Sequence, residues 1–511
     1  MDERTPVSKS AWNNIHLNRR EFVAASVAGG VSMALAACGR TTEPAPKLAQ
    51  AIAAVEAARP HTGRTVTATL IPQPATVDLG GQLARTWAYG DVIPGPLIRA
   101  NVGDELAITV KNGLNAPTSV HWHGIALRND MDGVFPATPN IAANSDFTYR
   151  FSSPHPGTYW AHPHVGLQAD YGLYLPLIID DPAEAAHYDA EWIVVLDDWT
   201  DGIGKSPQQI YDEQKGEGMP AEMPGMSAMP GMTAVGSSSL LGGDSGDVEY
   251  PYYLVNGRVP TAPTTFDAKP GQRIRIRFIN VGADTAFRVA LAGHTMTVTH
   301  TDGFPVVPTV VDALLLGMAE RYDVVVTAGD GIFPLVAMPE GKKAQPGRAL
   351  LSTGAGSAPD VNFAPPELNR RVGTVDMFTA TPAASFGSTK SDADLALELT
   401  GSMTNFDWGL NGKPYPKSPT LSIKQGQRGT LTFTNSTTMY HPMHLHGHTF
   451  QVIKADGSLG ARKDTVNVLP KQKVDTLLIA DNPGTWMIHC HNSYHQEAGM
   501  MTALNYTAFT T

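Results

Sequence analysis

The chain contains little charge, almost no cysteine and no long apolar stretch. Of its 511 residues 17% are charged, the net charge is −11, and only two are cysteines. The acidic balance argues against a nucleic-acid partner and provides no basic patch for a membrane surface. Two cysteines exclude a disulfide-rich scaffold. The apolar run at residues 22–37 is short for a membrane span.

The N-terminus indicates export. Asn18-Arg19-Arg20-Glu21-Phe22 is a twin-arginine signature, and the following apolar run suits a signal sequence. Leu35-Ala36-Ala37-Cys38 resembles a lipobox, so residues 1–38 are predicted to be a signal peptide with a lipidated Cys38; cleavage without lipid is the alternative. We expect a lipoprotein on the outer face of the cytoplasmic membrane, in the periplasm. Cys490 would then be the only free thiol.

The rest of the chain predicts an all-β fold. Its length suits about three domains. Short β-branched or alternating segments recur in three blocks, among them LAITVKN, QRIRIRFINV and RGTLTFTNS. Three Greek-key β-sandwich domains are therefore expected. The predicted segments are a tether with an Ala-rich, helix-capable part (39–60), a first domain (61–185), a second (186–365) and a third (366–511).

The most informative motif is His489-Cys490-His491. On a β-strand, neighbouring side chains point to opposite faces, so the two histidines would face one way and Cys490 the other. His495 and Met500 follow at five-residue intervals. Cysteine, histidine and a weak axial methionine are the ligands of a blue-copper site. One short peptide could thus contact two metal centres.

Three further clusters repeat the His-x-His pattern. They are His121-Trp-His123-Gly, His162-Pro-His164 and His441-Pro-Met-His444-Leu-His446-Gly-His448. On a strand, each pattern places both imidazoles on one face. Because the clusters lie in the first and third blocks, a site that uses both must form where those domains meet. The middle block has no His-x-His, so we expect it to be architectural.

All four motifs, in this order, resemble those of the multicopper oxidases, over nearly the whole exported chain. The stretches HWHGIALRNDMDG, GTYWAHPHVGLQ and LDDWTDGIGKSPQQ are most similar to the exported lipoprotein oxidases of mycobacteria and related actinobacteria. The resemblance implies cupredoxin-like domains and four copper ions per chain. It assigns His441, Cys490, His495 and axial Met500 to type 1 copper. It assigns His121 and His444 to type 2 copper, and His123, His162, His491 together with His164, His446, His489 to the two type 3 coppers.

Asp132 is predicted to be a proton relay. It occupies the position where related oxidases have an acidic residue near the copper cluster, although an Asp-Gly turn is the simpler interpretation. In copper-tolerance members a second relay carboxylate is common just after the type 1 histidine. Gln496 stands there in this chain, so that second route is in doubt.

A methionine-rich insertion covers residues 219–232. Its prolines and glycines disfavour a regular helix, and thioethers select Cu(I). We interpret it as a loop that collects Cu(I) as substrate; a low-complexity insertion is the alternative. The GDSG string at residues 243–246 lacks any serine-protease context and is assigned no role. The methionines are Met219, Met223, Met226, Met229 and Met232.

The sequence therefore predicts an extracytoplasmic multicopper oxidase, acting as a monomer. It would oxidise Cu(I), and also Fe(II) and phenols, while reducing O2 to water. Its expected physiological role is copper resistance. A general laccase-type phenol oxidase or a ferroxidase is the alternative within this class. A non-catalytic copper-binding or cell-envelope structural protein is the alternative outside it.

Overall fold

The computed structural model describes residues 45–184, 188–216 and 235–509. Strands dominate these residues, which confirms the all-β prediction. No helix among them is both long and apolar enough to cross a membrane. The described helices are α2 (Ala45–Ala58), α3 (Pro207–Gln214), α4 (Ser493–Ala498) and the 3-10 turns η1 (Asn129–Met131), η2 (Ser239–Leu241), η3 (Pro366–Asn369) and η4 (Val375–Met377).

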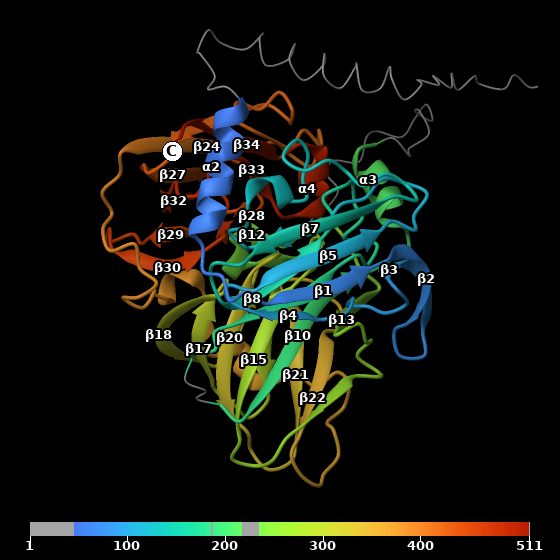
Figure 1. Cartoon of the computed structure of the whole chain (residues 1–511). Coiled ribbons are helices and arrows are strands. Elements are labelled where there is room, and N and C mark those ends of the chain that lie inside the picture. The colour runs from blue at the N-terminus through green and yellow to red at the C-terminus, as the bar shows by residue number, and fades with distance from the viewer. Residues whose placement is uncertain (1–44, 185–187, 217–234, 510–511) are drawn as a thin grey trace, which may run out of the picture. The chain divides into compact units, whose positions relative to one another are not determined.

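The strands form three successive sets of sheets (Figure 1). The first set has a three-stranded sheet, β1 (Thr65–Leu70), β5 (Glu105–Lys111), β7 (Asp146–Ser152); a four-stranded sheet, β4 (Ile98–Asn101), β9 (Leu175–Asp180), β8 (Gly157–His162), β6 (His121–His123); and a hairpin, β2 (Pro72–Asp78), β3 (Leu83–Tyr89).

The second set contains two six-stranded sheets and a short pair. One sheet is β13 (Tyr252–Val255), β10 (Ala190–Trp199), β15 (Arg273–Asn280), β20 (Arg321–Thr327), β17 (Met296–Thr301), β18 (Phe304–Val311). The other is β14 (Thr264–Asp267), β22 (Gly347–Ser352), β21 (Ile332–Pro339), β16 (Phe287–Leu291), β19 (Ala313–Leu316), β23 (Val372–Gly373). The pair is β11 (Ser237–Ser238), β12 (Gly243–Asp244). Because β23 still pairs with β19, the second set runs past residue 365, where the sequence placed the end of that domain.

The third set has one six-stranded and one five-stranded sheet. The six-stranded sheet is β25 (Gly409–Leu410), β24 (Ala393–Thr400), β27 (Arg428–Asn435), β32 (Lys473–Ile479), β29 (Phe450–Ile453), β30 (Leu459–Lys463). The five-stranded sheet is β26 (Leu421–Lys424), β34 (Met501–Ala508), β33 (Thr485–Cys490), β28 (His441–Leu445), β31 (Thr465–Val468).

The three sets share one topology. Each has at least two parallel strand pairs, β1–β5 and β4–β9 in the first, β10–β15 and β14–β22 in the second, β24–β27 and β26–β34 in the third. The second set has a further parallel pair, β19–β23. Parallel pairs need crossover connections and cannot be simple hairpins. The repetition therefore marks three copies of one sandwich, whose cores merge into one continuous apolar cluster.

Helix α2 lies in the segment predicted as a tether and contacts the first and third sets (Figure 1). The carboxylate of Glu56 accepts a hydrogen bond from the hydroxyl of Ser152 at 2.8 Å. Arg59 donates to the side chain of Asn482 at 3.2 Å. The Ala-rich segment thus forms the helix expected of it.

Candidate metal centres

Cys490, His441 and His495 form one compact, buried group. The Cys490 sulfur lies 3.6 Å from Nδ1 of His441 and 3.8 Å from Nδ1 of His495. The two Nδ1 atoms are 3.2 Å apart. Burial raises the pKa of the Cys490 thiol, so the thiolate needs a cation beside it. A metal ion held by Cys490, His441 and His495 would supply that charge.

Local sequence explains how these residues meet. Strand β33 ends at Cys490, and Asn492 then begins α4 by accepting hydrogen bonds from the main-chain N–H groups of Tyr494 and His495. Helix α4 is short, and the chain then runs back beside β33, where the N–H of Cys490 donates to the carbonyl of Met500 at 3.0 Å. The side chain of Met500 is buried, and its axial role stays a prediction.

The eight remaining motif histidines gather in a second group. Strand β6 pairs with β8 so that His121 lies opposite His162, and β28 pairs with β33 so that His444 lies opposite His489. The side chain of Cys490 belongs to the other group, as strand alternation predicted. Within the second group, three-residue sets lie within 4.8 Å of one another: His123, His162, His491; His164, His446, His489; and His121, His123, His444.

The ring nitrogens of this group fit metal ions. Five buried nitrogens that face its centre have no hydrogen-bond partner, which is costly unless something else occupies them. In four of these rings the other nitrogen is hydrogen-bonded. For example, Nδ1 of His121 lies 3.0 Å from the carbonyl of Asp132, and Nδ1 of His162 lies 2.9 Å from the carbonyl of Pro163. The unpartnered atoms are Nε2 of His121, His162, His444 and His491, and Nδ1 of His123.

The other three rings point Nε2 at one another. Nε2 of His489 lies 2.9 Å from Nε2 of His446 and 3.3 Å from Nε2 of His164. Burial lowers the pKa of His446 and His489 well below the usual value, and that of His164 to about 3. These imidazoles are therefore neutral and able to bind metal. Two of the three sets contain the residues that the resemblance assigned to type 3 copper, and the third adds His123 to the predicted type 2 pair. The allocation of individual ions stays a prediction.

Asp132 lies against the second group. Its Oδ2 is 3.0 Å from Nδ1 of His446 and its Oδ1 is 3.2 Å from Nδ1 of His121. The turn interpretation also holds, because Gly133 has φ +81° and a Cβ there would meet the carbonyl of Val120 at 1.8 Å. The turn therefore places the carboxylate beside two candidate ligands.

The structure also reveals residues that sequence reasoning missed. Asp464 contacts His123 through Oδ1 at 3.1 Å, and Asp247 contacts Nε2 of His495 through Oδ2 at 3.3 Å. Asp247 directly follows the GDSG string to which the sequence assigned no role. Neither aspartate lies in a metal-ligand pattern, so no local signal identified them. His448 binds the hydroxyl of Tyr506 at 2.7 Å and belongs to no metal group.

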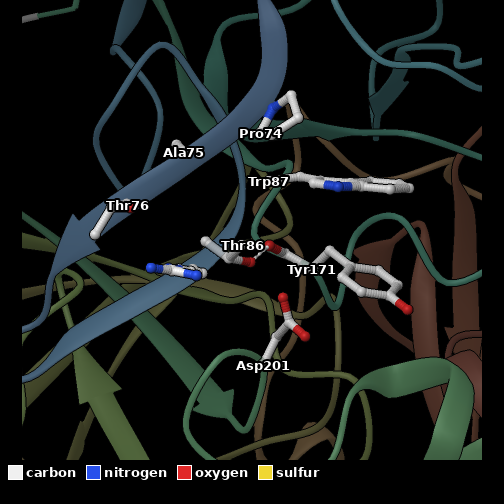
Figure 2. Close-up of a pocket in the computed structure, with 8 residues that line it drawn as sticks. Pro74, Ala75, Thr76, Thr86, Trp87, Tyr171 and Asp201 are labelled. Carbon is white, nitrogen blue, oxygen red and sulfur yellow. Dashed lines mark hydrogen bonds between the residues drawn. The ribbon is translucent and has the colours of Figure 1, made fainter.

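The candidate ligands are buried, except His164, which is half-buried. A surface pocket of about 420 Å³ lies beneath the β2–β3 hairpin, where the rings of Trp87 and Tyr171 stack above Asp201 (Figure 2). None of the candidate ligands lines it. Cys38 and the methionines of segment 219–232 lie outside the described residues.

Comparison with known proteins gives the family. Residues 73–184, 190–355 and 389–508 each match a family described as multicopper oxidase. The Multicopper oxidase MmcO of Mycobacterium tuberculosis is 63% identical over 499 residues, 98% of each chain. The chain belongs to the multicopper oxidase family. As a multicopper oxidase it is an oxidoreductase with copper cofactors, which confirms both predictions.

Other relatives of this multicopper oxidase extend the comparison. The Copper resistance protein A homolog of Pseudomonas syringae pv. tomato is 30% identical, over 83% of this chain and 89% of that protein. The crystal structure of Fet3p, described as a multicopper oxidase that functions in iron import, superposes with a TM-score of 0.72. At 21% identity over 87% of this chain and 90% of that one, it shows a shared fold.

Proposed function

We propose that this multicopper oxidase oxidises Cu(I) to Cu(II) outside the cytoplasm, reduces O2 to water, and so serves copper resistance. Bound copper supplies the one-electron redox chemistry and the reaction with O2. Four Cu(I) ions, one O2 and four protons would give four Cu(II) ions and two waters. The copper-resistance names of two curated relatives support this role.

The contact between Asp247 and His495 carries the proposal. The side chain of His495 is 1% exposed, and the Trp408 ring covers it with centroids 4.1 Å apart. A phenol therefore has no ring edge to contact. The Asp247 side chain keeps 7% of its surface exposed, and a carboxylate attracts a small cation. A donor ion at Asp247 would be one hydrogen bond from a predicted type 1 ligand.

Asp284 holds both partners of this contact. Its Oδ2 accepts hydrogen bonds from the main-chain N–H groups of Asp247 and Val248, each at 3.1 Å. Its Oδ1 accepts from the side chain of Asn492 at 2.7 Å, and Asn492 caps the helix that carries His495. The middle domain thereby aligns the electron entry point.

The two ends of the methionine-rich segment support its role as a Cu(I)-collecting loop. Before it, the hydroxyl of Tyr211 in α3 lies 3.4 Å from the carbonyl of Glu497 in α4. After it, the chain runs through β12 to Asp247. Both described flanks thus lead to the helix of His495.

From His495 inward, the chain's own residues connect the two metal groups. Cys490 is bonded in sequence to His489 and His491, so an electron accepted beside its sulfur needs to cross only a few covalent bonds. Asp132 offers a proton acceptor in a water-poor site next to His446 and His121. We place the proton relay there.

Oxygen uptake tests the proposed donor. The copper-loaded protein is expected to consume O2 faster, and at lower KM, with Cu(I) than with a phenol. Deleting residues 219–232 is expected to raise the KM for Cu(I) about 10-fold, an effect of the size expected when about 1.4 kcal/mol of binding is lost. Phenol kinetics serve as the internal control. Efficient phenol turnover with sluggish Cu(I) turnover would indicate a laccase, and equal losses for both donors would remove the role of the loop.

We also propose export by the twin-arginine route and lipidation at Cys38, on the sequence of the first 38 residues. Cells that express the protein should incorporate labelled palmitate into it, and Cys38→Ala should abolish the label while leaving export intact. An unlabelled wild-type protein would point to simple cleavage. Because one chain supplies every candidate ligand, a monomer suffices for the reaction.

A further inference from the structure

A fully buried network of five charged residues lies where the three domains meet. Arg321, Glu320 and Asp302 come from the second domain, and Lys463 and Asp464 from the third. Their side chains are at most 2% exposed. Burying charges costs free energy unless every charge is paired and hydrogen-bonded. The network has three acids and two bases, and each carboxylate pairs with at least one base inside it.

Arg321 and Asp464 form its closest pair. Nη1 of Arg321 donates to Oδ1 of Asp464 at 2.8 Å, and Nη2 donates to Oδ2 at 2.5 Å. This is the bidentate geometry typical of a guanidinium–carboxylate pair. Arg321 also donates to the carbonyls of Thr158 at 3.0 Å and Ala319 at 3.1 Å. The arginine is therefore held on several sides, and it holds the carboxylate of Asp464 in one orientation.

Gly124, the residue that ends the first histidine motif, makes room for this pair. A Cβ at this position would lie 2.3 Å from Nη2 of Arg321 and 2.6 Å from Oδ2 of Asp464. Gly124 also has φ +85°, which disfavours other residues. The glycine of His121-Trp-His123-Gly thus lets the other two domains approach His123.

Asp464 contacts two candidate copper ligands at once. Its Oδ1 lies 3.1 Å from Nε2 of His123, and its main-chain carbonyl lies 2.9 Å from Nδ1 of His444. Both oxygens accept, so Nε2 of His123 and Nδ1 of His444 must carry the protons. The nitrogens left to bind metal are Nδ1 of His123 and Nε2 of His444, and both are unpartnered in the structure.

We propose that Asp464, held by Arg321 of the second domain, is a positioning residue that decides which ring nitrogen His123 presents to the copper cluster. No described residue of the second domain belongs to a candidate metal group, yet through Arg321 that domain orients a ligand of the first domain. This inference rests on the eight-histidine group being the copper cluster.

The test is Asp464→Asn in the full-length copper-loaded protein. Removing groups that orient metal ligands typically costs 10- to 100-fold in metal affinity. We expect copper at the eight-histidine group to be lost at about 10- to 100-fold lower chelator concentration. The magnetic coupling of the type 3 pair should weaken, so that new Cu(II) signals appear in the EPR spectrum. The blue type 1 absorption should be unchanged, because Cys490 belongs to the other group.

Asp323→Asn is the matched control. Asp323 is an equally buried aspartate that pairs with Arg275 at 2.6 Å and Arg277 at 3.0 Å, without contact to any candidate ligand. The Asp323→Asn substitution is expected to lower the melting temperature while leaving copper retention and the EPR spectrum unchanged. Equal copper loss in both variants, or an unchanged spectrum in Asp464→Asn, would overturn the positioning role and leave Asp464 as part of the domain contact.

A second variant covers the case in which Asp464→Asn does not fold. Arg321→Lys keeps the positive charge but loses the bidentate hydrogen bonds to Asp464, so it should give the same EPR change with a smaller amplitude. A folded Arg321→Lys protein with a wild-type spectrum would contradict the proposal. If the wild-type protein bound no copper at the eight-histidine group, the cluster assignment itself would fail, which is a separate outcome.

Discussion

Replacing Cys490 with serine is expected to abolish both the blue colour and the oxidase activity with every external donor. The thiolate sulfur lies between His441 and His495 and is the ligand type that distinguishes a blue-copper site. A serine hydroxyl stays protonated and binds copper weakly. Visible absorption, copper content and oxygen uptake would measure the loss, which should reach background.

Copper at the eight-histidine group should survive this substitution, because strand β33 turns the side chain of Cys490 away from His489. Met501→Leu is a suitable control: Met501 neighbours the predicted axial Met500 but packs with Val134 and Met487. It should keep both colour and turnover. Blue absorption that persists in Cys490→Ser would refute the type 1 assignment.

Asp132→Asn is expected to lower steady-state oxygen consumption about 100-fold. A positioned acid or base contributes about 10²- to 10⁴-fold where proton transfer limits the rate. The asparagine keeps the shape of the turn before Gly133 but can no longer accept a proton next to His446. Anaerobic reduction of the type 1 centre by the donor should be unaffected, since that step needs no proton from Asp132.

Asp130→Asn provides the comparison in the same turn. Asp130 is 43% exposed and pairs with Arg128 at 2.6 Å, so its loss should change turnover less than 2-fold, as for most surface pairs. Equal effects of the two substitutions would mean that the turn, and not a proton at Asp132, matters. A slowed type 1 reduction in Asp132→Asn would point to disturbed copper sites instead.

The candidate ligands were predictable from sequence because the four motifs resemble those of a known family, and the faces they occupy followed from local strand geometry. A period of two places His489 and His491 on one face and Cys490 on the other, whatever the rest of the chain does. The spacing from Cys490 to Met500 likewise needs only one short helix and a return. The same argument placed the shared site between the first and third domains, since the His-x-His clusters occur only there.

Residues that contact the ligands but lie far from them in the sequence could not be found this way. His123 and Asp464 are 341 residues apart and lie in different domains. Arg321 stands in a domain that the sequence described only as architectural. Asp247 follows a string that suggested nothing about metals. In each case the residue acts through contacts that form only in the folded chain, and such contacts leave no periodic pattern in the sequence.

The sequence by itself determined the strand-rich fold, the family and the side chains that face each metal group, because these depend on the period of a strand and on short spacings. The tertiary structure alone decided which nitrogen each histidine presents and which carboxylates support them. Those features depend on how three sandwiches pack, and a buried hydrogen bond forms only where packing brings its two partners together.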